Sequence, residues 1–133
     1  MRSVLELGKP WEKTVHFSLG VVLGGKILHT AGVTARDAEG RLVGEGDIRK
    51  QTQQCFDNLG DILAAAGTGF EHVAKYTIFT TDIQRFHLET MDVRAPYFAG
   101  KPAATLVEVS RLIHPGMLVE IEAVVHVPGE AAK

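Results

Sequence analysis

Two glutamates stand two positions apart near the end of the sequence, inside the largely apolar run from Leu118 to Val127. Because side chains alternate between the faces of a β-strand, Glu120 and Glu122 share one face and a purely apolar row forms the other. A carboxylate in a cleft can orient or activate a water molecule and exchange protons with a substrate. Alternatively, such a carboxylate is structural and pairs at a seam between subunits. The residues by themselves leave both interpretations open.

Other residue types that carry chemistry form no recognisable site in the sequence. None of the six histidines has a metal-ligand spacing such as His-Glu-x-x-His, and the glycines near Gly24 and Gly44 make no phosphate-binding pattern. The single cysteine, Cys55, cannot form an internal disulfide. Its place on an apolar helical row favours a buried, inert thiol. We therefore expect no metal site.

Length and charge exclude several classes of protein. The 133 residues suit one domain, 1–133, with an ordered core over about 15–127 and a flexible C-terminal tail at 128–133. The net charge is −2 and no run of Lys or Arg is present. We therefore expect no nucleic-acid partner. The sequence has neither an apolar stretch near the ~20 residues of a membrane span nor an apolar signal region. It predicts a cytoplasmic protein without membrane contact.

The hydrophobic patterns predict an α+β order of elements around these glutamates. A long helix is expected at Asp47–Ala66, with Asp47 as its N-cap and Gly67 just beyond its end. A second helix is expected at Phe86–Ala95. Strands are expected at Val15–Val22, Lys26–Ala31, His72–Thr81, Ala104–Ser110 and Leu118–Val127, the first two joined in a hairpin at Gly24-Gly25.

Two helices can cover only one side of such a sheet. The apolar row of the last strand is expected to lie beneath them. The second face of that strand carries the two glutamates but is half apolar, so water is a poor environment for it. We therefore expect a partner subunit to cover this second face, with the carboxylates at the seam.

An ordered series of short motifs spans about 15–127, nearly the whole chain. In order, they are Gln51-Thr52 with Gln54, Asn58-Leu59, Ala64-Ala65-Ala66-Gly67, Val73 and Lys75 with Thr77-Ile78-Phe79, Asp82, Phe86, Pro102-Ala103, Val107-Glu108-Val109, Arg111-Leu112 and Val119-Glu120-Ile121-Glu122-Ala123. No single motif is diagnostic, but the set at these spacings is specific. It resembles the Rid family, the YjgF-type reactive-intermediate (enamine/imine) deaminases.

The resemblance implies a fold, an assembly and a reaction. The fold would be chorismate-mutase-like, an α+β single domain whose mixed sheet carries two helices on one face. Three copies would form a homotrimer with small-molecule clefts between subunits. Members that act as deaminases hydrolyse 2-imino or 2-enamino acids to 2-oxo acids and ammonia. That reaction needs no metal, and we expect no cofactor.

The resemblance also assigns candidate site residues one by one. Glu120 matches the family's glutamate and is the catalytic candidate. Gly32 and Val33 match the segment whose backbone borders the substrate. Thr105 keeps a hydroxyl where the family often has serine, and Leu106 follows it on the same strand. These four residues are expected to bind the substrate.

Two further positions in the expected substrate site depart from the family pattern. Ala104 stands where the family has an arginine that binds the substrate carboxylate, and Phe17 stands where it has a tyrosine. A guanidinium grips a carboxylate through two charge-assisted hydrogen bonds, so its loss weakens productive binding. Arg36, Arg94 and Lys101 are candidates for a replacement cation.

The resemblance therefore leaves three functions open. The first is an enamine/imine deaminase, or a relative that acts on a related enamine. The second is a noncatalytic homologue that binds a small 2-imino or 2-oxo acid in the same cleft, because Ala104 replaces the arginine. The third is an endoribonuclease or translation inhibitor, a label attached to some relatives. The acidic balance and the absence of a basic patch make it the least favoured.

Overall fold

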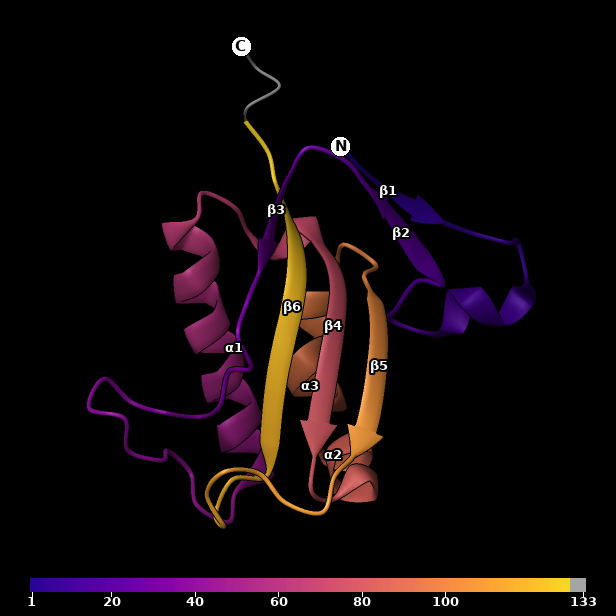
Figure 1. Ribbon diagram of the computed structural model, residues 1–133. Helices are drawn as coiled ribbons and strands as arrows, with labels where there is room; N and C mark the ends of the chain where they lie inside the picture. The colour runs from indigo at the N-terminus through magenta and orange to yellow at the C-terminus, as the bar shows by residue number, and fades with distance from the viewer. Residues whose placement is uncertain (130–133) are drawn as a thin grey trace.

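A four-stranded mixed sheet forms the centre of the computed structural model, which describes residues 1–129 (Figure 1). Its strand order is β3-β6-β4-β5. Strand β6 runs antiparallel to both β3 and β4, whereas β4 and β5 are parallel. The strands span Lys26–His29 (β3), Val73–Thr80 (β4), Ala103–Glu108 (β5) and Val119–Val127 (β6). The predicted α+β class and mixed sheet are confirmed.

The helices lie on one face of this sheet and leave the other face uncovered, as Figure 1 shows. Helix α1 spans Ile48–Ala65, and the Asp47 side chain accepts a hydrogen bond from the Lys50 N–H at its start. Gly67 follows with a φ of +79°, a left-handed conformation that glycine adopts without strain. The long helix is therefore confirmed, together with both of its predicted end signals.

The second predicted helix is wrong in its bounds and in its continuity. Asp82 caps a helix that starts earlier, α2 at Ile83–Glu89, and a short separate helix, α3, follows at Met91–Arg94. At the junction the Thr90 hydroxyl donates to the Phe86 carbonyl at 2.7 Å. The backbone at Thr90 leaves the helical conformation, with φ −118° and ψ 9°, and so separates the two helices. Residues 1–129 thus contain three α-helices where two were predicted.

The predicted first strand, Val15–Val22, is also wrong. Only Gly20–Leu23 forms a strand, β2, which pairs antiparallel with β1 at Arg2–Leu5 in a separate two-stranded sheet. A short 3₁₀ helix occupies Pro10–Thr14. The predicted β2–β3 hairpin is therefore absent from the described residues, since β2 takes β1 as its partner and β3 takes β6.

The apolar row of β6 lies under the helices, as predicted. Val119, Ile121 and Val125 are fully buried, and they pack in one core cluster with helix residues such as Phe56. The alternate residues Glu120 and Glu122 are half-buried on the opposite side of the strand. The strict alternation of the sequence thus separates core from candidate site on a single element.

Two further expectations concern the C-terminal tail and membrane-spanning helices. The predicted tail at 128–133 falls mostly outside the described residues, which stop at 129. Among the helices of the described part, none has both the length and the apolar character to cross a membrane.

Candidate functional site

The Glu120 side chain lies directly against the backbone of Gly32. A methyl group built on Gly32 would overlap the Glu120 carboxylate, so only a residue without a Cβ leaves that carboxylate in its observed place. The carboxylate makes no hydrogen bond or ion pair with any residue in the range 1–129. It is therefore free to accept a hydrogen bond from a ligand or a water molecule.

A shallow pocket of about 480 Å³ opens beside this contact. We call it the glutamate pocket; it is lined by Ala31, Gly32, Val33, Thr34, Arg36, Asn58, Ile62, Ile113 and Glu120. Three of the predicted site residues, Glu120, Gly32 and Val33, thus come together here. Of the candidate cations, Arg36 lines this pocket, and its Nε donates to the Thr34 hydroxyl at 3.1 Å.

The loop that carries Gly32 is held from two sides. Val33 exchanges backbone hydrogen bonds with Ile121 at 2.8 and 3.0 Å, which fixes the loop alongside β6. From α1, the Asn58 amide donates to the carbonyls of Thr34 and Arg36 at 3.0 and 2.9 Å. The motif residue Asn58, which also lines the pocket, therefore positions the backbone at the site.

The two departures from the family pattern, Phe17 and Ala104, meet in a different place. Together with Leu106 they border a second pocket of about 310 Å³, between β5 and the α2–α3 helices. We call it the arginine pocket; its lining is Thr14, Val15, His16, Phe17, Ile78, His87, Met91, Arg94, Phe98, Ala104 and Leu106. One of the three candidate cations, Arg94, therefore shares a pocket with Ala104.

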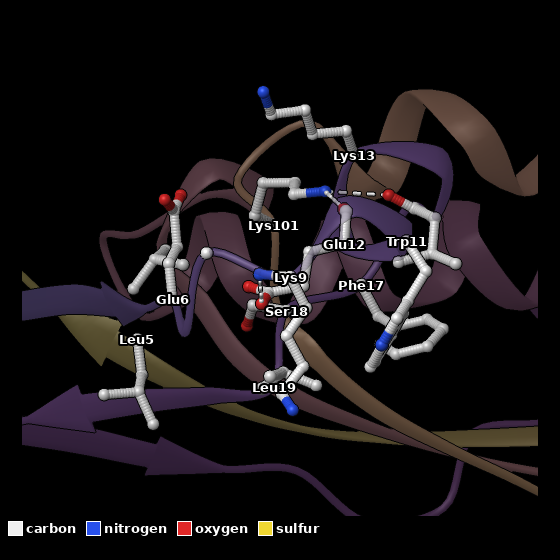
Figure 2. A pocket seen from close by; sticks show the side chains of 13 residues that line it. Leu5, Glu6, Lys9, Trp11, Glu12, Lys13, Phe17, Ser18, Leu19 and Lys101 are labelled. Atoms are coloured by element: carbon white, nitrogen blue, oxygen red, sulfur yellow. Dashed lines mark hydrogen bonds between the residues drawn. The ribbon is translucent and has the colours of Figure 1, made fainter.

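Lys101, the last of the candidate cations, lines neither of these pockets and instead binds the N-terminal segment. Its Nζ donates to the backbone carbonyl of Val15 at 2.7 Å, and Figure 2 shows it reaching into the N-terminal segment. The pocket drawn there has a volume of about 210 Å³ and includes Trp11 and Phe17, whose ring centroids are 6.5 Å apart. Lys101 thus holds the segment that carries Phe17, whose ring borders both this pocket and the arginine pocket.

Thr105 stands apart from both pockets. Its position on β5 faces the uncovered side of the sheet, and its hydroxyl accepts a hydrogen bond from Lys75 Nζ at 2.7 Å. Glu122 lies on the same uncovered side, opposite Thr77 in the β6–β4 pairing. Within one chain the predicted site residues are therefore divided between the glutamate pocket, the arginine pocket and the open sheet face.

Two histidines, His16 and His87, line the arginine pocket. In the sequence His16 is notable only because it precedes Phe17 near the expected cleft, where a surface histidine is the favoured interpretation, and His87 belongs to no motif. Their proximity depends on how the bend at 15–17 folds onto α2, which no local pattern encodes. Among residues 1–129, no group of three or more His, Cys, Asp or Glu side chains could hold a metal ion.

Cys55 plays no part in either pocket. Its side chain is fully buried, and burial raises the pKa of its thiol far above the usual range. Since the thiolate is the nucleophilic form, this cysteine is chemically inert in the folded chain, as the apolar helical row predicted.

Comparison with known proteins shows which family this chain belongs to. Residues 9–127 match the model of the family described as Endoribonuclease L-PSP. A RutC family protein of Pyrococcus horikoshii is 38% identical over 106 residues, which cover 79% of this chain and 82% of that protein. The 2-iminobutanoate/2-iminopropanoate deaminase of Rattus norvegicus is 34% identical over 105 residues, covering 77% of this chain and 74% of the rat protein.

Solved structures agree with these sequence relatives. The Rid family protein YyfB of Yersinia pestis superposes with a TM-score of 0.85 at 30% identity, covering 94% of this chain and 98% of YyfB. The member of the YjgF/YER057c/UK114 family from Mycobacterium tuberculosis gives a TM-score of 0.67 at 34% identity, covering 96% of this chain and all of that one. The motifs, the fold and both comparisons agree, and the chain belongs to the Rid family.

Proposed function

We propose that this chain is a hydrolase of 2-imino or 2-enamino acids that works as a homotrimer with its active sites between subunits. The observation that carries the proposal is the division of the site. The glutamate pocket holds Glu120 with Arg36, whose Nε donates to the Thr34 hydroxyl, whereas the arginine pocket holds Phe17, Ala104 and Arg94 without a carboxylate. Two half-sites on one chain become whole sites if neighbouring copies bring unlike halves together.

The uncovered sheet face supports such an assembly. Half-apolar and half-polar, it carries Phe79, Val107 and Val124 beside Glu120 and Glu122. Val107 is 36% exposed, on the edge strand β5. A second copy packed there would bury this apolar surface and remove water from the neighbourhood of Glu120.

The chemistry asked of Glu120 is general base and then general acid catalysis. Its carboxylate takes a proton from water while the water oxygen bonds to the carbon of the protonated imine and the C=N π electrons move to nitrogen, which gives a neutral carbinolamine. The same carboxyl then returns that proton to the amino group. The regenerated carboxylate takes the hydroxyl proton as the carbon–nitrogen bond breaks and the carbonyl forms, and the departing ammonia finally accepts that proton from the carboxyl. The products are a 2-oxo acid and ammonia, and no electron transfer is required.

The same proposal includes the fold type, the domain bounds, the ligand and the location of the protein. They are the chorismate-mutase-like label for the fold, one domain with a core at about 15–127, and a small 2-imino or 2-oxo acid as ligand. A cytoplasmic location is proposed from the single cysteine. An endoribonuclease activity is less favoured, because a net charge of −2 without a basic run gives little attraction for phosphates.

A second candidate function is noncatalytic binding of the same class of metabolite. The observation that favours it is Ala104, whose methyl group cannot bind a carboxylate. An imine assay separates the two functions. 2-Iminobutanoate and 2-iminopropanoate would be generated in situ by an amino acid oxidase, and imine loss would be followed with and without the protein.

We expect the wild-type protein to hasten imine loss and Glu120→Gln to slow the catalysed reaction by about 10²–10⁴-fold, the range typical of a lost general acid–base. Glu122→Gln is the matched control, because it removes a carboxylate from the same strand face outside both pockets. Imine decay no faster than in buffer would leave noncatalytic binding as the function.

A further inference from the structure

The guanidinium of Arg94 is held in place, yet its hydrogen-bonding capacity is only partly used. Its Cζ lies 5.1 Å from the centroid of the Phe86 ring, and its Nη2 donates to the His87 carbonyl at 3.0 Å and lies 3.4 Å from Nδ1 of the same histidine. The Nε atom is buried and has no hydrogen-bond partner among residues 1–129. Buried N–H groups without partners are rare in folded proteins, so this one needs an explanation.

The charge of Arg94 is also uncompensated. The described lining of the arginine pocket contains no Asp or Glu, and its other polar side chains are Thr14, His16 and His87. No ion pair to Arg94 is found within the described residues. Burial lowers the pKa of Arg94, but a guanidinium stays charged at neutral pH. A positioned, partly desolvated cation of this kind is suited to an anionic ligand.

The other residues of the pocket determine which side chain that ligand can carry. Phe17, Ile78, Met91, Phe98 and Leu106 offer apolar surface and no hydrogen-bonding groups. A ligand with a polar side chain would lose its water without finding partners, whereas an apolar side chain gains from burial. The pocket volume of about 310 Å³ is at the small end of the range for ligand sites.

We infer that the arginine pocket binds small 2-oxo and 2-imino acids with an apolar side chain, and that Arg94 binds their carboxylate. The cation thus comes from α3 in place of one at position 104 on β5. The inference rests on the proposed function for its imino substrates and deepens it by assigning carboxylate binding to Arg94 and a preference for apolar side chains to the rest of the pocket.

The test is calorimetric binding of a stable 2-oxo acid to the full chain. 4-Methyl-2-oxopentanoate is the probe, and 4-methyl-2-pentanone is its counterpart without a carboxylate. We expect the acid to bind and the ketone to bind at least tenfold more weakly. Arg94→Met should weaken acid binding by about 10–100-fold, as expected for lost charge-assisted hydrogen bonds, and leave ketone binding nearly unchanged.

A matched control comes from Arg41, which is 74% exposed, pairs with Asp37 and lines neither pocket. Arg41→Met should bind the acid as the wild type does. Arg94→Lys keeps the positive charge but loses the planar guanidinium with its paired N–H donors. Its affinity for the acid should therefore lie between those of the wild type and Arg94→Met. The wild-type comparison of acid and ketone tests the inference independently of whether Arg94→Met folds.

Equal binding of acid and ketone, undiminished binding by Arg94→Met, or no binding of the acid would overturn the inference. The imine assay separates it from the proposed function. Imine turnover by Arg94→Met at the wild-type rate would sustain the deaminase and contradict the role of Arg94. Arg94-dependent binding without turnover by the wild type would sustain the role of Arg94 and contradict the deaminase.

Discussion

At the scale of residues, the contact between Gly32 and Glu120 links two positions that are far apart in sequence. Alternation along the last strand is enough to predict that Glu120 faces away from the core. That alternation says nothing about Gly32, whose backbone approaches the carboxylate so closely that no Cβ fits between them. The glycine therefore decides where the catalytic candidate points.

Replacing Gly32 by alanine is expected to lower activity while changing stability little. The added methyl meets the far end of a flexible side chain, so Glu120 can rotate away at small cost to folding. A carboxylate displaced by about 1 Å loses its alignment, which can reduce turnover by roughly 10²-fold. The imine assay and thermal melting measure the two effects.

Gly24→Ala is the matched control for this substitution, because a Cβ at Gly24 meets nothing within 4 Å. It should retain wild-type turnover. Unchanged turnover in Gly32→Ala would mean that the observed position of the Glu120 carboxylate is irrelevant to catalysis. A large fall in melting temperature would instead point to a structural role for Gly32.

At the scale of elements, the predictions from sequence succeed where an element is specified by its own residues. Helix α1 and strand β6 carry their periodicity and end signals within themselves. The segment at 15–22 is apolar enough to predict a strand, but its backbone partners are remote. Lys101 binds the Val15 carbonyl, and the Ser18 N–H donates to the Pro102 carbonyl at 2.7 Å. Such long-range pairing leaves no local periodicity to recognise.

The same contrast between locally specified elements and segments held by remote partners explains how much of the site is predictable. The family resemblance groups Glu120 with the Gly32–Val33 loop, and these residues do line one pocket. Arg94 shares a pocket with Ala104 and lies on α3, after a break in the chain where the sequence pattern predicts one continuous helix. The sequence alone therefore leaves Arg94 as one of three candidate cations.

The helix α3 is tied to α1 by an exposed ion pair whose effect depends on pH. Arg49 donates to both carboxylate oxygens of Asp92, at 2.7 and 2.9 Å. The hydrogen bonds from Arg49 lower the pKa of Asp92 to about 2 from its usual 3.8. A carboxylate with a depressed folded-state pKa stabilises the fold above its unfolded-state pKa, and that stabilisation is lost as pH falls through the folded-state value.

We therefore expect Asp92→Asn to melt at a slightly lower temperature than the wild type at pH 6, and the difference to shrink between about pH 4 and pH 2. The effect is small because both partners are exposed. Asp61→Asn, on the exposed side of α1, is the control and should show no such convergence. A melting difference that grows towards pH 2 would contradict a stabilising role for the ion pair.

At the scale of the whole molecule, the two sides of the sheet have different environments. One side is filled by the helices and a continuous core, and the other exposes apolar and charged side chains together. The edge strand β5 contributes to both the open face and the arginine pocket. An assembly that covers the open face therefore also changes the surroundings of both half-sites.

The assembly can be tested by placing a charge on the open face. We expect the wild-type chain to sediment at three times the 14.4-kDa mass of one copy. Val107→Asp should sediment as a single copy with its fold intact, because an unpaired carboxylate is costly only once a partner buries it. Imine turnover should fall in parallel, since separated subunits hold only half-sites.

The control for this experiment is Leu88→Asp, which puts the same charge on an apolar residue of α2 that is 73% exposed. Because α2 lies on the other side of the sheet from Val107, this variant should keep the trimer mass. A stable wild-type monomer that still consumes imine would place the whole reaction within one chain. In that case Glu120 and Arg94 would not act in one shared site. A loss of imine turnover together with the loss of the trimer in Val107→Asp is therefore the result that would link the two pockets.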